Sequence, residues 1–337
     1  MAGLVRLFAF LAAASPTRRQ RLAVSAIVAA LSAVFVSNTY KAAPEYHSDF
    51  GIAWFGGRAM LDGRDPYQVI GPGREFDIKW APLYPATAMV AGMPFAALTE
   101  KLATMGFVAI SVFLLAYGIT RDGWHLMPLF ATEPFASSAR LGQWSILVTA
   151  AYFLPWLGFL TLAKPQAFLP ILVASRSRTP FLFASIGGVA LLLISLAFLP
   201  SWPAAWLDAM KSTSHMSPPI ARPGGFLILL LLFKWRRPET WLVIVMACIP
   251  QTWGWYNALP LLAVARTLIE SCGLAIVVTI GALAALLVTP TVTSADAFHA
   301  WLGSLVVLAV YLPVVVLILL RPNVRSAHRA EPTLSPN

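Results

Sequence analysis

The sequence has 337 residues, of which 58% are hydrophobic and 11% are charged, and its net charge is +10. A soluble globular domain carries roughly 25% charged residues, so this composition excludes an ordinary soluble fold and predicts an all-α polytopic membrane protein. The basic residues gather in short stretches between apolar runs, which the positive-inside rule assigns to the cytoplasmic face. Membrane lipids are therefore expected partners, and nucleic acid is not.

The chain is expected to form one membrane domain, residues 1–337. A spanning helix needs about 20 residues, so about ten to twelve transmembrane or re-entrant helices fit, and twelve is favoured. Residues 1–21 are predicted to be a cytoplasmic interfacial segment and residues 321–337 a cytoplasmic tail, which requires an even number of crossings. Cys248 and Cys272 lie in or beside apolar segments, which favours small buried side chains over a disulfide or a zinc site.

In chain order, the first span is predicted over residues 22–37, which follow the basic stretch RRQR. It delivers the loop of residues 38–81 to the non-cytoplasmic side, and residues 200–225 form a second external loop. Further apolar segments are predicted at 83–98, 102–119, 126–135, 144–162, 167–174, 181–199, 226–233, 241–253, 259–265, 274–288 and 301–320. Several are too short to cross a bilayer, and such broken helices persist only where they pack in protein or line a wet cavity.

The first external loop concentrates acidic residues, namely Glu45, Asp49, Asp62, Asp65, Glu75 and Asp77. Ser48 and Asp49 are good N-cap residues for a helix that ends before Gly63. Its residues Phe50, Ala53, Trp54 and Leu61 recur at helical spacing, which predicts an amphipathic helix lying in the membrane interface, with its apolar side in the lipid headgroups or on the helix bundle. The following DGRDPY is expected to form a turn in which Asp62 and Asp65 bond the local backbone.

Asp49 lies where the first span meets this predicted interfacial helix. Partial burial at such a junction can tune a carboxylate to accept a proton from a sugar hydroxyl. The alternative for the acidic residues of the loop is a solvated surface with no chemical role.

Three stretches, in the same order, resemble one family. SDFGIAWFGGRAMLDGRDPY (48–67) is similar to the DF..YW.A...L..G.DPY signature of polyprenyl-phosphate-mannose-dependent alpha-mannosyltransferases, glycosyltransferase family eighty-seven of the GT-C superfamily. PLYPATAMVAGMPFAAL (82–98) resembles the segment that follows that loop, and RLGQWSILV (140–148) with KPQ (164–166) resembles the family's GQ and KPQ elements. The resemblance covers about the first 180 residues, and the opening loop is its specific part.

The resemblance implies a GT-C fold and a plasma-membrane enzyme that moves a hexose, with mannose expected, from a polyprenyl-phosphate donor to a glycolipid or polysaccharide acceptor. The site would lie on the non-cytoplasmic face, with Asp49 as the general base. The departing phosphate needs cations, for which Lys164, Arg140 and Arg58 are the candidates. Lys164 follows an apolar run, where an ionisable residue suggests function, although a lysine that reaches to the interface is the alternative.

Arg140 has two possible placements. If the segment before it is a full crossing, Arg140 lies on the cytoplasmic side and outside the site; if that segment is re-entrant, Arg140 stays on the external side near Lys164.

The remaining candidates would contact the substrates, and each also has a structural explanation such as interhelix packing, a turn or an interfacial aromatic belt. They are Gln143, Gln166, Asp65, Tyr67, His215, Trp255 and Tyr256. Trp255 and Tyr256 belong to PQTWGWYNALP (250–260), which lacks the histidine that family members carry in a comparable segment.

The external loops contain no adjacent Asp-x-Asp pair and the chain has no nucleotide-binding fingerprint, so metal-independent transfer from a lipid-borne donor, without a cofactor, is expected. Two other functions stay open. One is a multi-pass transporter or flippase of lipid-linked sugars, and the other is an inactive accessory subunit of an envelope glycan pathway.

Overall fold

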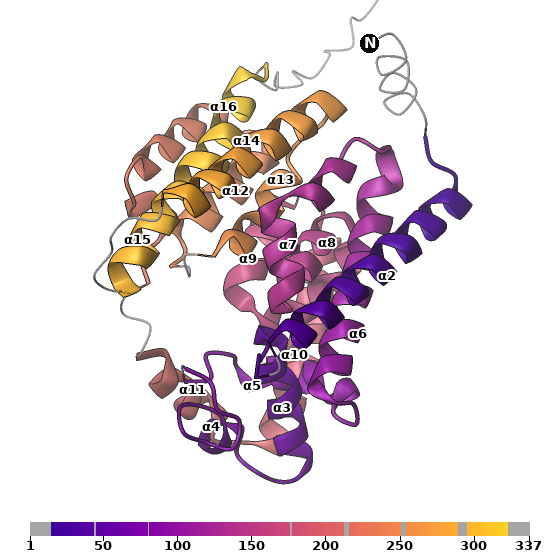
Figure 1. Ribbon diagram of the computed structural model, residues 1–337, viewed down its shortest axis with the longest axis vertical. Helices are drawn as coiled ribbons and strands as arrows, with labels where there is room; N and C mark the ends of the chain where they lie inside the picture. Colours follow the sequence, from indigo (N-terminus) through magenta and orange to yellow (C-terminus); the bar gives the residue numbers. More distant parts are fainter. Residues whose placement is uncertain are drawn as a thin grey trace, which may run out of the picture.

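The computed structural model describes residues 15–43, 45–79, 81–175, 177–211, 216–250, 254–288 and 295–322. Within these ranges the regular structure is helical, apart from an isolated bridge between Ile70 and Phe76 (Figure 1). Five helical stretches are long and apolar enough to cross a membrane: Arg18–Ala42, Glu100–Asp122, Thr179–Phe198, Leu268–Leu287 and Ala300–Leu320. The described chain is thus an all-helical protein with the helices of a membrane protein.

The five long stretches contain α2 (Arg18–Ala42), α6 (Glu100–Ile119), α10 (Thr179–Phe198), α14 (Leu268–Leu287) and, joined end to end, α15 (Ala295–Val306), the π-turn η9 (Val307–Tyr311) and α16 (Leu312–Leu320). The shorter elements are α3 (Asp49–Leu61), α4 (Pro66–Val69), α5 (Ala86–Gly92), η1 (Met93–Phe95), η2 (Thr120–Asp122), η3 (Met127–Ala131), α7 (Glu133–Leu141), α8 (Ser145–Phe153), η4 (Pro155–Ala163), α9 (Pro165–Ala174), α11 (Trp202–Met210), η6 (Pro219–Ala221), η7 (Gly225–Lys234), α12 (Pro238–Cys248), η8 (Trp255–Ala258) and α13 (Leu259–Leu262). The ten to twelve apolar segments expected from the sequence therefore divide into long helices and many shorter ones.

The long helix α10 presents large apolar side chains outward. Leu182, Ile186 and Leu193 are 59%, 63% and 62% exposed. Water would penalise such a continuous apolar surface, whereas lipid tails would not. The surface of α10 therefore agrees with a place against the hydrocarbon of a membrane.

Helices α2 and α6 lie side by side and run in opposite directions (Figure 1). At one end, the Tyr40 hydroxyl of α2 donates to the Glu100 carboxylate that begins α6, at 3.1 Å. At the other end, the Arg21 guanidinium donates to the carbonyl of Tyr117 at 2.6 Å. We name these the Asp49 end and the Arg21 end; α3, α4, α5 and α11 gather at the Asp49 end, at the bottom of Figure 1.

Two hairpins of short helices enter the bundle from the Arg21 end. In the first hairpin, α7 leads to Gly142, where an added Cβ would meet Thr104 at 3.0 Å and Ser48 at 3.3 Å, at the Asp49 end. Helix α8 then returns, and an added Cβ at Gly118, late in α6, would lie 2.9 Å from Phe153. Gly142 has φ +63°, a conformation that glycine adopts readily and that ends α7. The hairpin therefore reverses at the depth of Ser48.

The second hairpin is formed by η4 and α9, with Lys164 between them. It starts at Pro155 beside the end of α8 and follows the first half of α10, where Gly158 lies against Pro180 and Gly187 against Phe159. This corrects the single apolar segment expected over residues 144–162, because the chain turns back at Leu154. Pro155 has no backbone N–H and restricts the residue before it, which ends α8.

Helix α3 corrects another expectation. It begins after an N-cap at Ser48 and ends before Gly63, which has φ +70°, as expected. However, residues on all its faces are buried, including Ile52, Phe55 and Gly57, while Leu61 is 52% exposed. The helix therefore packs on the bundle with nearly all of its faces rather than with one apolar face, because α5 and α6 cover it.

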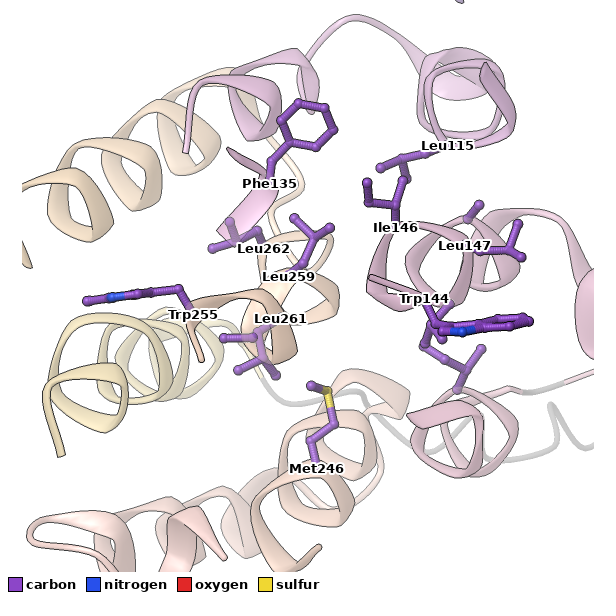
Figure 2. Packing of buried hydrophobic residues seen from close by; sticks show 14 of the residues in the cluster. Leu115, Phe135, Trp144, Ile146, Leu147, Met246, Trp255, Leu259, Leu261 and Leu262 are labelled. Carbon is purple, nitrogen blue, oxygen red and sulfur yellow. The ribbon is translucent and has the colours of Figure 1, made fainter. Parts of the chain in front are cut away.

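The carboxy-terminal helices join the amino-terminal ones through a shared apolar core. In Figure 2, Leu259 and Leu262 of α13 lie on the side of Phe135 of α7, whereas Leu261 points toward Met246 of α12. Leu115, Ile146 and Leu147 lie on the opposite side of this core (Figure 2). The first hairpin is thus packed between the two sets of helices.

A buried ionic cluster joins the helix ends of the carboxy-terminal set. The Glu239 carboxylate, 3% exposed, accepts from Arg237 at 3.1 Å, Arg266 at 2.9 Å and Arg321 at 3.1 Å. Arg321 also pairs with Glu270 at 2.9 Å. Three of the basic residues that the positive-inside rule assigned to one face, Arg237, Arg266 and Arg321, therefore meet around a common carboxylate.

Candidate functional site

Asp49 is the first residue of α3, and the residue before it is held by three hydrogen bonds. The Ser48 hydroxyl accepts from the amide of Gly51 at 2.9 Å and lies 2.8 Å from the Thr104 hydroxyl. The Ser48 amide donates to the Glu100 carboxylate at 2.9 Å. Because Thr104 and Glu100 both belong to α6, these bonds determine where Asp49 lies relative to the first long pair of helices.

Glu100 is the centre of this arrangement. Besides Ser48, its carboxylate accepts from the Tyr40 hydroxyl at 3.1 Å and lies 2.7 Å from Nδ1 of His47. Any side chain at Gly51 would collide with the Glu100 carboxylate, so only glycine allows this approach. The sequence alone does not indicate this role of Glu100, because its partners lie 52 to 60 residues away and no local pattern connects them.

Asp49 itself is partly buried, and within the described ranges its carboxylate accepts no hydrogen bond. Burial raises the pKa of Asp49 to about 6, and the nearby Lys164 ammonium opposes that rise. A carboxylate with this pKa is largely ionised at neutral pH and still basic enough to accept a proton from a hydroxyl as it reacts. Asp49 lies outside the five helical stretches that could span a membrane.

Lys164, at the turn of the second hairpin, is the cation that acts on Asp49. Its ammonium donates to Oε1 of Gln143 at 3.0 Å and to the Tyr84 hydroxyl at 3.5 Å, the long limit of a hydrogen bond. Burial lowers the pKa of Lys164 to about 8, and Asp49 opposes this decrease. The two hairpin turns therefore meet at Lys164 and Gln143, beside Asp49.

Gln143 is 2% exposed and directly follows Gly142 in the turn of the first hairpin. Its backbone amide donates to the carbonyl of Ser138 at 2.8 Å, and its side-chain oxygen accepts from the Lys164 ammonium. The Gln143 side chain thus orients the Lys164 ammonium, so two residues that the sequence named as candidates are in contact.

Tyr84 completes the site and was not predicted from the sequence. It is buried, and its carbonyl accepts from the Tyr67 hydroxyl at 2.9 Å. The carbonyl of Leu83 accepts from the indole of Trp206 in α11 at 3.0 Å. Burial raises the pKa of Tyr84 well above its usual value, and the charges of Asp49 and Tyr256 add to this effect.

Arg140 lies at the Asp49 end. The Tyr46 hydroxyl donates to the Arg140 carbonyl at 3.0 Å, and burial together with the charge of Asp49 raises the pKa of Tyr46. The Arg140 guanidinium is half exposed and contacts Glu133 at 3.5 Å. Of the two placements considered for Arg140, the structure has the one on the side of Lys164, because α7 turns back at Gly142.

Several predicted residues are not brought into this cluster. Arg58 is exposed and nine residues along α3 from Asp49, or about 13 Å at 1.5 Å per residue. Asp65 caps α4 by accepting from the backbone amide of Tyr67 at 2.8 Å, so it bonds the local backbone as predicted. The Tyr67 hydroxyl donates to the backbone carbonyl of Tyr84. Gln166 is exposed in the first turn of α9.

Trp255 and Tyr256 differ in their surroundings. Trp255 is 7% exposed and packs in the core next to α14, 3.5 Å from the position of a Cβ at Gly281, so it is a core residue (Figure 2). Tyr256 acts electrostatically on Tyr84 and so lies near the site. His215 lies outside the described residues.

Comparison with protein-family models, with curated proteins and with solved structures finds no match for this chain. Within the described ranges, no group of three or more His, Cys, Asp or Glu side chains is placed to share a metal ion. The geometry defines the class of protein: a helical, membrane-type bundle with a partly buried base, a partly buried cation and a buried phenol grouped at one end.

Proposed function

We propose that this protein is a membrane glycosyltransferase that moves a hexose, with mannose as the expected sugar, from a polyprenyl-phosphate donor to a glycolipid or polysaccharide acceptor. The GT-C superfamily is the proposed family and fold, and the non-cytoplasmic face is the proposed side of the active site. The observation that carries the proposal is the position of Asp49 beside Lys164, where the turns of the two hairpins meet: one group is suited to accept a proton and the other to hold a phosphate.

In this reaction, the Asp49 carboxylate accepts the proton of the acceptor hydroxyl while the hydroxyl oxygen forms a bond to the anomeric carbon of the sugar. The bond between that carbon and the phosphate oxygen breaks, and the phosphate leaves with the electron pair. The Lys164 ammonium stabilises the negative charge that develops on the departing phosphate. Gln143 keeps the ammonium oriented, since its side-chain oxygen accepts from Nζ. Arg140, at the same end, is the second candidate cation.

The lipid carrier explains the remainder of the architecture under this proposal. A polyprenyl tail requires an apolar environment, and the exposed apolar surface of α10 is adjacent to η4, whose end carries Lys164. Under the proposal, the lipid tail lies against α10 and the phosphate is bound by Lys164 at the end of η4.

The experiment that tests the proposal measures transfer of radiolabelled sugar from polyprenyl-phosphate mannose to a membrane lipid extract. Purified wild-type protein is compared with Asp49→Asn, and donors carrying glucose and arabinose are tried in parallel. We expect a labelled product that decreases at least about a hundredfold in the variant, the range that general bases contribute. Equal transfer by both proteins would remove Asp49 from the mechanism, and the absence of transfer with every donor would argue against the enzyme.

A carrier of lipid-linked sugars is the second candidate, because Lys164 lies between two short helices, as ionisable groups do at the broken helices of transporters. Reconstitution in vesicles separates the two functions. A carrier moves a fluorescent polyprenyl-phosphate sugar across the bilayer without an acceptor, whereas the transferase converts the donor only when an acceptor is present.

A further inference from the structure

Among the tyrosines around the start of α3, Tyr84 differs from the others in the hydrogen bond that its hydroxyl makes. The hydroxyl of Tyr40 donates to the Glu100 carboxylate, that of Tyr46 to the Arg140 carbonyl and that of Tyr67 to the Tyr84 carbonyl. The Tyr84 hydroxyl instead accepts from the Lys164 ammonium, which has no lone pair to accept in return. Within the described residues, the hydrogen of the Tyr84 hydroxyl is therefore the phenolic donor here without a protein acceptor.

A buried donor without an acceptor costs free energy, so proteins pair such groups almost always. Tyr84 is 8% exposed, and its backbone position is determined by hydrogen bonds from α4 and α11. The Lys164 ammonium also lies over the ring of Tyr84, with Nζ 5.3 Å from the ring centre. The hydroxyl is thus held beside the ammonium, and the described protein residues supply no acceptor for its hydrogen.

We propose that Tyr84 binds the donor phosphate, with its hydroxyl donating a hydrogen bond to a phosphate oxygen that the Lys164 ammonium also contacts. This inference rests on the proposed function and adds a second group to the phosphate site. The phenol also lies close enough to Asp49 to interact with its charge. The hydrogen bond becomes stronger as negative charge accumulates on the departing phosphate.

The test measures equilibrium binding of two probes to the purified, full-length protein in detergent: a polyprenyl phosphate and the polyprenol of the same length, which lacks the phosphate. The dissociation constant of the polyprenol divided by that of the polyprenyl phosphate is the preference for the phosphate, and this ratio reports the contribution of the phosphate site. We expect Tyr84→Phe to reduce this ratio about tenfold to a hundredfold, the effect of a lost hydrogen bond to a charged group, and to leave polyprenol binding unchanged.

Tyr117→Phe is the matched control, since it removes the same oxygen from a tyrosine at the Arg21 end of α6. We expect it to bind both probes like the wild type. Replacement of Tyr84 by 3-fluorotyrosine, which keeps the hydroxyl and makes it a stronger donor, should preserve or increase the ratio. This second variant keeps the proposal testable if Tyr84→Phe does not fold.

The outcomes are distinguishable. If the wild-type protein binds the phosphate no more tightly than the alcohol, the proposed function fails. If it prefers the phosphate and Tyr84→Phe retains the full preference, the function stands and Tyr84 is removed from the phosphate site. A decrease in the ratio with 3-fluorotyrosine would also contradict the role of the hydroxyl as a donor.

Discussion

The backbone amide of Ser48 donates a hydrogen bond to the carboxylate of Glu100 at 2.9 Å, across 52 residues of sequence. This bond connects the residue before Asp49 to the first turn of α6, and the same carboxylate contacts Tyr40 and His47. Glu100 therefore positions the candidate base by holding the residue before it.

Glu100→Ala should remove the acceptor for the Ser48 amide and displace Asp49. We expect transfer activity to decrease at least tenfold through kcat, with a loss of about 1–3 kcal/mol in the free energy of unfolding for the unpaired buried groups. Glu100→Gln keeps an oxygen that can accept from the Ser48 amide, so its kcat should be higher than that of Glu100→Ala.

Glu133→Gln, in the exposed pair with Arg140, is the control and should change stability by less than about 1 kcal/mol. Equal activity of Glu100→Ala and the wild type would contradict the positioning role.

The activity should depend on pH through Asp49 and Lys164. Burial raises the pKa of Asp49 to about 6, so the base is protonated and inactive below that pH, and the rate rises as the pH increases through it. Burial lowers the pKa of Lys164 to about 8, so the ammonium loses its charge and the rate decreases above that pH. The expected profile of kcat/KM is a bell with its maximum near pH 7, measured with the radiolabelled donor.

A matched variant assigns the limbs of this profile. Lys164→Arg keeps a positive charge at high pH, because the guanidinium does not titrate in this range. It should reduce the maximal rate and abolish the decrease above about pH 8. A wild-type rate that does not change between pH 5 and pH 9 would contradict both assignments.

Gly142 at the turn of the first hairpin should not accept a side chain. Its φ is +63°, and an added Cβ would lie 3.0 Å from Thr104 and 3.3 Å from both Phe50 and Ser48. Gly142→Ala should therefore lower the unfolding free energy by more than about 1 kcal/mol and decrease transfer, since Gln143 follows directly. Gly63→Ala is the matched control, with φ +70° and nothing within 4 Å of the added Cβ. Equal losses of stability in the two variants, measured by thermal unfolding in detergent, would show that the backbone conformation alone matters.

The ionic cluster at Glu239 should support stability and not chemistry. Burial raises the pKa of Glu239, but a backbone hydrogen bond and the charges of Arg266, Arg237 and Arg321 outweigh this and lower it. Glu239→Gln leaves the buried Arg237 guanidinium without a counter-charge, while Arg321 keeps Glu270, so we expect a loss of about 3–5 kcal/mol. Asp208→Asn, in the fully exposed pair with Lys211, should leave the melting temperature unchanged. A stable Glu239→Gln protein would show that the arginines can be solvated.

Several features of this protein follow from local sequence patterns. The apolar segments predicted the membrane-type helices, because hydrophobic length is a property of contiguous residues. Ser48, Gly63 and Asp65 predicted the start and end of α3 and the turn after it, because capping and turn chemistry act within three or four residues. Asp49 and Lys164 were noted from the cost of placing ionisable groups in apolar surroundings and from the family resemblance.

The tertiary structure decided what those patterns could not. Burial of α3 on all faces depends on α5 and α6, which no periodicity within α3 can indicate. The reversals at Gly142 and Leu154 bring Gln143 to Lys164 and keep Arg140 at the Asp49 end, although charge patterns allowed either side. Glu100 is bonded by Ser48, 52 residues away. Tyr84 is bonded by Tyr67 and Lys164, 17 and 80 residues away, and the carbonyl of its neighbour Leu83 is bonded by Trp206, 123 residues away. Contacts at such separations arise only when the helices pack, and for that reason the sequence determined the elements and tertiary packing determined the site.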